Sequence, residues 1–178
     1  MTQNIREYLA TILNDKNEKN WYEPELFAQN TLAKLPHGLR VVALPPPEKE
    51  NYNCFIFALH LDKDKQIIQE SKGFIHSSFF EVLLDKGELE MVQKPAEGDI
   101  VCYRNPKKFD SEITHAGIVQ AEGVIISKWS WGPIIQHKIF DVPDFYGDEI
   151  FYVKRVGGEK AKELYSRYKV FNINIHSQ

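Results

Sequence analysis

Cysteine is scarce in this chain, and it has neither a long apolar run nor an excess of positive charge. Its 178 residues include two cysteines, Cys54 and Cys102, whereas a small secreted scaffold held by disulfides would use more. The formal net charge is -3 and no basic stripe with interleaved aromatic residues occurs, which argues against nucleic acid as a partner. No run approaches the ~18 apolar residues of a membrane span. A globular protein remains, and 43% hydrophobic residues are typical of one.

The stretch Met1–Tyr8 lacks the apolar core that a secretory signal peptide needs. We therefore expect a cytoplasmic protein, or one that leaves the cell by a route without a cleavable signal. The length of 178 residues suits a single domain with a core of its own. Within it we expect an N-terminal helical extension and Pro-rich connector over 1–50, a core over 51–155, and a C-terminal helix and tail over 156–178.

Hydrophobic periodicity changes along the chain from helical to alternating. The predicted helices cover Thr2–Asn14, Pro24–Leu35, Asn53–Leu61, Ser77–Asp85 and Glu159–Lys169, and a short extended run covers Leu39–Leu44. The predicted strands cover Ile100–Arg104, Thr114–Gln120, Val124–Trp129, Ile134–Phe140 and Asp148–Arg155. Because the connections between the strands are short, the pattern predicts an α+β domain with a five-stranded antiparallel meander.

The stretch from Asn51 to Leu61 places Cys54 at the predicted start of an apolar helix. Asn53 is a good N-cap, because its side chain can accept a hydrogen bond from a free backbone N–H. A thiol in the first turn also lies near the positive end of the helix dipole, which favours the thiolate. The pattern predicts a nucleophilic cysteine, and a buried structural cysteine is the alternative.

Cysteine catalysis needs a base beside the sulfur and a group that orients the base. His115 is the favoured base among six histidines, because the small residues Ala116 and Gly117 leave room for another element to approach its strand. The helix that carries Cys54 would then pack on the sheet with its first turn near His115. A half-exposed strand residue without a catalytic role is the alternative for this histidine.

Metal and nucleotide sites leave no signature in the chain. Cys54, Cys102, His115 and His137 could hold zinc in principle, but no Cys-x-x-Cys or His-x-x-x-His pair occurs. The glycine patterns of phosphate loops and dinucleotide sites are also absent. We therefore expect no metal and no organic cofactor.

Three motifs follow one another in the predicted core. Asn53-Cys54 opens the apolar helix, Glu97–Val101 leads into a strand, and Thr114–Val119 forms the next strand around a histidine. Their order resembles the papain-like cysteine hydrolases of the NlpC type, which include bacterial cell-wall peptidases and amidases. The resemblance covers roughly Asn51 to Arg155. It implies a papain-like α+β fold, in which the nucleophile-bearing helix packs on the five-stranded antiparallel sheet.

Three further features look closer to a bacterial branch of this group that has Ser-Lys and Tyr-Gly signatures. These features are Ser127-Lys128-Trp129, His137 and Tyr146-Gly147-Asp148. The resemblance implies Cys54 as the nucleophile and His115 as the general base, in the unpermuted order with the cysteine first. Two residues compete as the third residue, which orients the base. Ser127 stands at the matching position of the next strand, whereas His137 suits the role better chemically, because serine orients an imidazole less well than a second imidazole does.

We expect the oxyanion and the substrate to be held close to the nucleophile. The backbone N–H of Cys54, with Asn51 or Asn53 as a side-chain donor, is the expected oxyanion site. Lys128 and Trp129 are the expected substrate contacts, and packing in the core is the alternative for the tryptophan.

The function we expect is a cysteine-dependent hydrolase of an amide, peptide or related acyl bond, acting on a peptide, a peptidoglycan fragment or a protein. The nucleophile stands in the context Asn-Cys-Phe-Ile, where the cell-wall enzymes have Asp-Cys-Ser-Gly. This difference motivates a first alternative, an inactive binding module on the same fold. The second alternative is a deamidase or acyltransferase that modifies a partner protein with the same pair of residues. The oligomeric state stays open.

Overall fold

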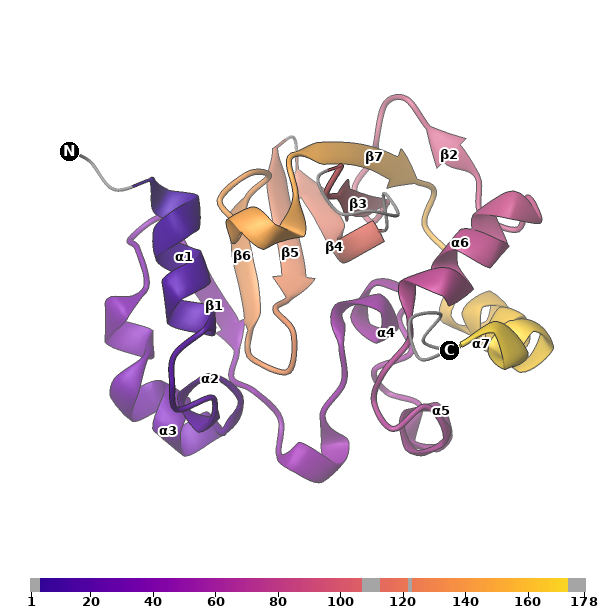
Figure 1. Cartoon of the computed structure of the whole chain (residues 1–178). Helices are drawn as coiled ribbons and strands as arrows, with labels where there is room; N and C mark the ends of the chain where they lie inside the picture. Colours follow the sequence, from indigo (N-terminus) through magenta and orange to yellow (C-terminus); the bar gives the residue numbers. More distant parts are fainter. Residues whose placement is uncertain (1–3, 107–112, 122, 173–178) are drawn as a thin grey trace.

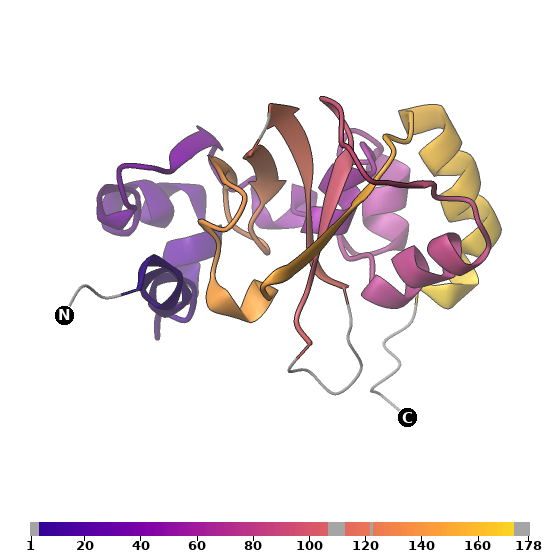
Figure 2. The same cartoon turned by 90° about the horizontal axis from the view of Figure 1, so that it is seen from above.

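Seven antiparallel strands form one sheet with helices on both faces in the computed structural model, which describes residues 4–106, 113–121 and 123–172 (Figures 1 and 2). The strands are β1 (Arg40–Ala43), β2 (Met91–Val92), β3 (Ile100–Arg104), β4 (Ile113–Ala121), β5 (Val124–Lys128), β6 (Ile134–Lys138) and β7 (Glu149–Val153). The α-helices are α1 (Ile5–Leu13), α2 (Lys19–Tyr22), α3 (Pro24–Asn30), α4 (Cys54–Ala58), α5 (Lys65–Glu70), α6 (Ser77–Asp85) and α7 (Gly158–Tyr168). Short 3-10 turns are η1 (Leu32–Lys34), η2 (Glu48–Glu50), η3 (Asp144–Tyr146) and η4 (Lys169–Phe171).

The strand order in the sheet is β1-β6-β5-β4-β3-β7-β2. β3, β4, β5 and β6 form a meander, as predicted, because each pairs with the strand before it. The prediction of a five-stranded meander was wrong at its last strand, since β7 pairs with β3 instead of β6. The free edge of β6 is already taken by β1, so β7 adds to the opposite side of the meander.

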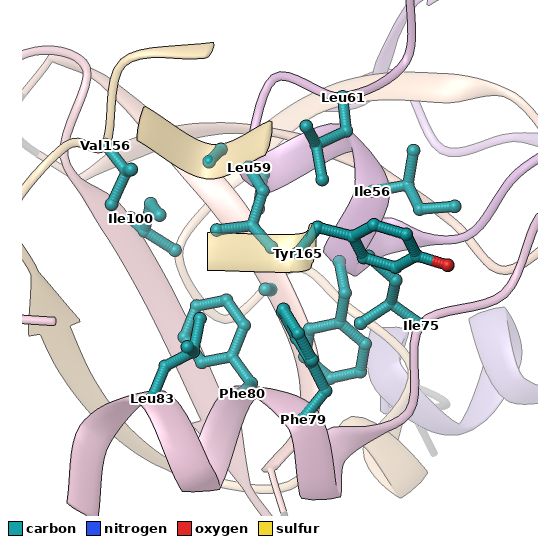
Figure 3. Packing of buried hydrophobic residues seen from close by; sticks show 14 of the residues in the cluster. Ile56, Leu59, Leu61, Ile75, Phe79, Phe80, Leu83, Ile100, Val156 and Tyr165 are labelled. Carbon is teal, nitrogen blue, oxygen red and sulfur yellow. The ribbon is translucent and has the colours of Figure 1, made fainter. Parts of the chain in front are cut away.

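Alternating side chains of the central strands enter two separate cores. On one face, helices α4 to α7 pack on residues such as Ile100 and Ala116. Figure 3 shows this core, where side chains of α6 and α7 meet those of the α4 segment. On the other face, α1 to α3 pack on residues such as Val101 and Tyr103. Because both faces are covered, the first four residues of β3 are all buried.

Three predicted helices begin where expected. α6 spans the predicted range Ser77–Asp85, α3 begins at Pro24, and α4 begins at Cys54, directly after its cap Asn53. α4 ends earlier than predicted, at Ala58, because a turn with His60 in the left-handed region (φ 56) closes it.

Other parts of the chain differ from the predicted elements. α5 and β2 have no predicted counterpart, and the first two residues of the helix predicted over 2–14 lie outside the described residues. The end of the predicted tail, residues 173–178, also lies outside them. Among the helices that the structure describes, none combines the length and the apolar composition needed to cross a membrane.

Candidate active site

The first residue of α4 is Cys54, and its neighbour Asn53 holds the start of the helix in place. The Asn53 Oδ1 accepts a hydrogen bond from the Ile56 N–H (3.3 Å), and its Nδ2 donates to the Ile75 carbonyl (2.7 Å). The helix packs against β4 and β5, as predicted for the helix that carries the cysteine (Figure 1). The cap therefore fixes where the thiol meets the sheet.

β4 and β5 part from each other where α4 meets them. Their pairing ends at Ile118 opposite Ile126, although β4 begins at Ile113 and β5 continues to Lys128. The first half of β4 is paired with β3 alone. Its Ala116 N–H lies close enough to the thiol of α4 to lower that thiol's pKa. The thiol therefore reaches the sheet at the part of β4 that is not paired with β5.

A β-bulge directs the side chain of His115 at the same place. Tyr103 pairs with His115 and Arg104 pairs with Ile113, so Thr114 is the extra residue on β4. Its hydroxyl oxygen lies 3.2 Å from the Tyr103 carbonyl oxygen. A bulge re-aims a side chain next to it, and such bulges are over-represented beside active sites.

A cavity of about 340 Å³ is lined by both Cys54 and His115. Its wall also includes residues from α1, α2, the turn after β5 and η3, among them Asn53, Trp21, Ser130 and Tyr146. The structure therefore brings the predicted nucleophile and the predicted base to one cavity, although they lie far apart in the sequence.

His115 is fully buried, and neither of its ring nitrogens has a hydrogen-bond partner among the described residues. Burial, followed by the charge of His137, holds the pKa of His115 well below its ordinary value of 6.5. The ring is therefore neutral and has one nitrogen free to accept a proton. A buried polar group without a partner is unusual, and a catalytic role is one of its recognised explanations.

Burial raises the pKa of the Cys54 thiol to about 11. The backbone N–H groups of Ala116, Cys54 and Phe55, followed by the charge of Lys128, lower the pKa but do not outweigh burial. Burial of the thiol therefore overrides the preference for a thiolate that the start of the short helix α4 was expected to give. The resting pair consists of a neutral thiol and a neutral imidazole.

The two candidates for the orienting residue, Ser127 and His137, bind each other. The Ser127 Oγ lies 2.8 Å from the His137 Nε2 and accepts a bond from the Trp129 Nε1 (2.9 Å). The His137 Nδ1 donates to the Lys138 carbonyl (2.8 Å), so in the neutral ring Nε2 accepts from the serine hydroxyl. Neither residue holds His115 through a hydrogen bond.

We expect His137 to make the fold sensitive to acid. Burial lowers its pKa from 6.5 to about 4, so between these values the unfolded chain binds a proton that the folded protein does not. The free energy of unfolding therefore carries no penalty from His137 above pH 6.5. As the pH drops from 6.5 towards 4, protonation of His137 in the unfolded chain lowers this free energy by about 3 kcal/mol. In His137→Gln the free energy of unfolding, measured by urea denaturation, should depend less on pH in this window. Exposed His37→Gln is the control, and an unchanged slope in His137→Gln would contradict the assignment.

Lys128 and Asn51 form a buried polar contact behind the cavity. The Lys128 Nζ donates to the Asn51 Oδ1 (3.0 Å) and to carbonyls of the turn after β5, and the Asn51 Nδ2 donates to the Trp131 carbonyl (2.7 Å). Burial lowers the pKa of Lys128 to about 7, and the charge of Cys54 opposes this shift. Neither residue lines the cavity that contains the thiol, but Asn51 lines a neighbouring hollow.

Trp129 also lies behind the cavity and not on its wall. Its side chain is fully buried in the core under α1 to α3, and its carbonyl accepts a bond from the Trp21 Nε1 (3.0 Å). Of the side chains expected to bind the oxyanion or the substrate, Asn53 lines the cavity, but its amide is already bonded to Ile75.

A second hollow, of about 490 Å³, adjoins the first and shares Trp21 and Ser130 with it. Three carboxylate residues line this second hollow, Asp15, Glu18 and Glu48, and none of them lines the cavity that contains the thiol.

Sequence reasoning missed some of the residues that complete the cavity. Trp21 comes from α2, outside the predicted core, and no local pattern marks it as part of a site. Tyr146 was noticed only as half of a Tyr-Gly pair, and that pair was the signal that could have identified it. Both residues reach the cavity through tertiary packing.

Cys102 lies in the core below α4, and neither cysteine of the chain forms a disulfide. Within residues 4–106, 113–121 and 123–172, no three His, Cys, Asp or Glu side chains gather in a way that could hold a metal ion.

No curated protein and no solved structure gives a significant match to the chain. A family sequence profile with the description Domain of unknown function (DUF7689) matches residues 44–154. This range contains Cys54, His115 and Tyr146, and it leaves α1 to α3 and α7 outside. Because the match covers more than half of the 178 residues, the chain belongs to the DUF7689 family.

Proposed function

We propose that this protein is a cysteine-dependent acyl hydrolase with Cys54 as the nucleophile and His115 as the general base. The observation that carries the proposal is the shared cavity, which is lined by a thiol at a helix start and by a buried imidazole whose nitrogens have no partner among the described residues. A nucleophile and a base that face one space are what acyl transfer by cysteine requires.

We also propose that the fold is a variant of the papain-like arrangement. A helix with the nucleophile at its first residue packs on a strand that carries the base, and the cysteine precedes the histidine in the chain. The order of the motifs quoted from the sequence supports the same assignment. In this protein the arrangement extends to seven strands and carries a second helical layer, α1 to α3.

The proposed reaction begins with two neutral groups. As the Cys54 sulfur attacks the carbonyl carbon, its proton passes to His115, a C–S bond forms and the carbonyl electron pair moves to oxygen. When that pair returns, the bond to the amine breaks, and the amine takes the proton from His115. Water then attacks the thioester and gives a proton to His115. The C–S bond breaks, the sulfur takes this proton back, and a carboxylic acid is released.

Backbone N–H groups would hold the oxyanion in the proposed reaction. The N–H groups of Cys54 and Phe55 lie in the first turn of α4, where helix geometry offers them no acceptor, and both lie close enough to the thiol to lower its pKa. A donor at this position stabilises the negative oxygen of the transition state by about 2.7–4 kcal/mol.

The two hollows share lining residues, and together they would provide room for several groups of a substrate. This room suits an extended chain, such as a peptide, a peptidoglycan fragment or a segment of a protein. Release by water gives hydrolysis, whereas the same thioester intermediate with an amine acceptor gives acyl transfer.

An inactive binding module is the second candidate function, and a specific observation favours it. Cys54 is only 6% exposed, and burial raises the pKa of its thiol to about 11, so nothing in the resting structure generates a thiolate. The two candidates differ in whether His115 changes the reactivity of the sulfur.

Alkylation by iodoacetamide, followed by mass spectrometry of the peptides, tests the proposal. Cys54 should react faster than Cys102, because Cys54 lines a cavity whereas Cys102 is fully buried in the core below α4. The rate for Cys54 should rise from about pH 6 to about pH 9, since the thiol has to lose a proton. In His115→Ala the rate should fall by about 100-fold, which is the contribution of a positioned base.

A second variant, His115→Gln, keeps most of the side-chain volume and guards against a general loss of structure in His115→Ala. The exposed His37→Gln serves as the control and should react like the wild type. Equal and slow labelling of Cys54 in the wild type and in both His115 variants, with the fold intact by circular dichroism, would support the binding module and refute the enzyme.

A further inference from the structure

Tyr146 is the last residue of η3 and lines the cavity together with Cys54 and His115. Its side chain is 5% exposed, and its hydroxyl has no partner with ordinary hydrogen-bond geometry among the described residues. Burial and then the charge of Cys54 raise the pKa of this hydroxyl well above 10, although the nearby backbone N–H of Ser130 lowers it. The hydroxyl therefore keeps its proton and remains a donor that no neighbour uses.

The ring of Tyr146 lies flat against the imidazole of His115. The ring centroids are 3.9 Å apart and the planes differ by 3°. The edge of Trp129 packs against the tyrosine ring at 6.3 Å and 89°. Stacking of this kind fixes the plane of the imidazole without a hydrogen bond to either nitrogen.

The backbone around Tyr146 is held from two sides. The hydroxyl of Thr114, the bulged residue of β4, donates to the Tyr146 carbonyl. From α1, Arg6 donates to the carbonyls of Gly147 and Val142 (3.2 Å for the latter). These contacts tie the tyrosine to the same bulge that directs His115 and to the helical layer outside the family match.

The two side-chain donors that the sequence suggested for the oxyanion, Asn53 and Asn51, are not free. The Asn53 amide donates to Ile75 and the Asn51 amide donates to Trp131, so the two donors expected from the sequence are already used. We propose that the Tyr146 hydroxyl donates a hydrogen bond to the substrate carbonyl oxygen as that oxygen becomes negative, beside the backbone N–H of Cys54. This assignment rests on the proposed function and adds a catalytic residue to it.

Tyr146→Phe tests the assignment, because it removes the hydroxyl and keeps the ring on His115. Two reagents distinguish an effect on the oxyanion from an effect on the reactivity of the thiol. p-Nitrophenyl acetate acylates a thiol through an oxyanion, whereas iodoacetamide alkylates it by displacement and forms none. We expect acylation of Cys54 in Tyr146→Phe to slow by about 100-fold, while His115-dependent alkylation stays within about twofold of the wild type.

Tyr103→Phe is a matched control. It also removes a buried hydroxyl from a ring beside His115 (5.4 Å), but Tyr103 bonds to the Ile139 carbonyl (2.7 Å) and does not line the cavity. Acylation in this variant should match the wild type.

Two results would overturn the assignment of Tyr146 alone. One is unchanged acylation in Tyr146→Phe, and the other is an equal loss of acylation and alkylation, which would mean that the hydroxyl acts on the thiol and not on the oxyanion. A wild type without His115-dependent alkylation would instead refute the proposed function, and the Tyr146 assignment with it.

Discussion

Cys54→Ala should abolish formation of an acyl-enzyme and lower turnover by about 10⁴-fold or more, because removal of the proposed nucleophile leaves only the binding and oxyanion contributions. The structure places this sulfur in a cavity with His115 and the first-turn N–H groups of α4, and no second thiol lines that cavity. The measurement is the burst of p-nitrophenolate from p-nitrophenyl acetate, with intact-protein mass spectrometry to detect one added acetyl group.

Cys102→Ala is the control for this experiment. Cys102 is fully buried in the core below α4, so its loss removes a similar volume without touching the cavity. The control should keep the burst and the acetyl adduct. A burst of equal size in Cys54→Ala would show that another residue is the nucleophile.

Gly147→Ala should destabilise the fold by more than about 3 kcal/mol. Gly147 has φ 96 and ψ 175, a region that is essentially restricted to glycine. A Cβ at this position would also overlap the carbonyl of Arg104 at the end of β3. Because the clash is with backbone, it can be relieved only by moving η3 away from the sheet. Urea denaturation and the thermal midpoint would both report the loss.

Gly87→Ala is the control that measures backbone strain without a steric overlap. Gly87 also has a positive φ (68), at the end of α6, but a Cβ there would meet nothing within 4 Å. Its cost should be about 1 kcal/mol, which is the ordinary penalty for a side chain in the left-handed region. If Gly147→Ala were as stable as Gly87→Ala, η3 would not be fixed against β3 as the structure describes. The position of Tyr146 over His115 would then need another explanation.

The helix at Cys54 and the strand at His115 could be predicted because local signals specify them. Asn53 is a good cap, and it does accept a bond from the first turn of α4. The strand that contains Ala116 and Gly117 has an apolar pattern, and it lies in the middle of the sheet. That the helix packs on this strand was predicted from the room left by the two small residues and is confirmed.

The partner of the base could not be predicted from the same signals. Ser127 and His137 were both candidates, and in the structure they bond to each other across β5 and β6. The residue that contacts the His115 ring face to face is Tyr146, from a turn that returns to the sheet after β6. Which of several side chains reaches the imidazole depends on how the turn is anchored by Thr114 and by Arg6.

By itself, the sequence determined the α+β class, the start of α4 at Cys54 and most of the strands, because caps and alternation act between residues close in the chain. The tertiary structure decided that β7 joins β3, since an edge is free only after the other strands have paired. The tertiary structure also decided the protonation states of Cys54 and His115. A helix start favours a thiolate, but burial raises the pKa of Cys54 to about 11. Desolvation depends on everything that surrounds the thiol, and no local pattern encodes it.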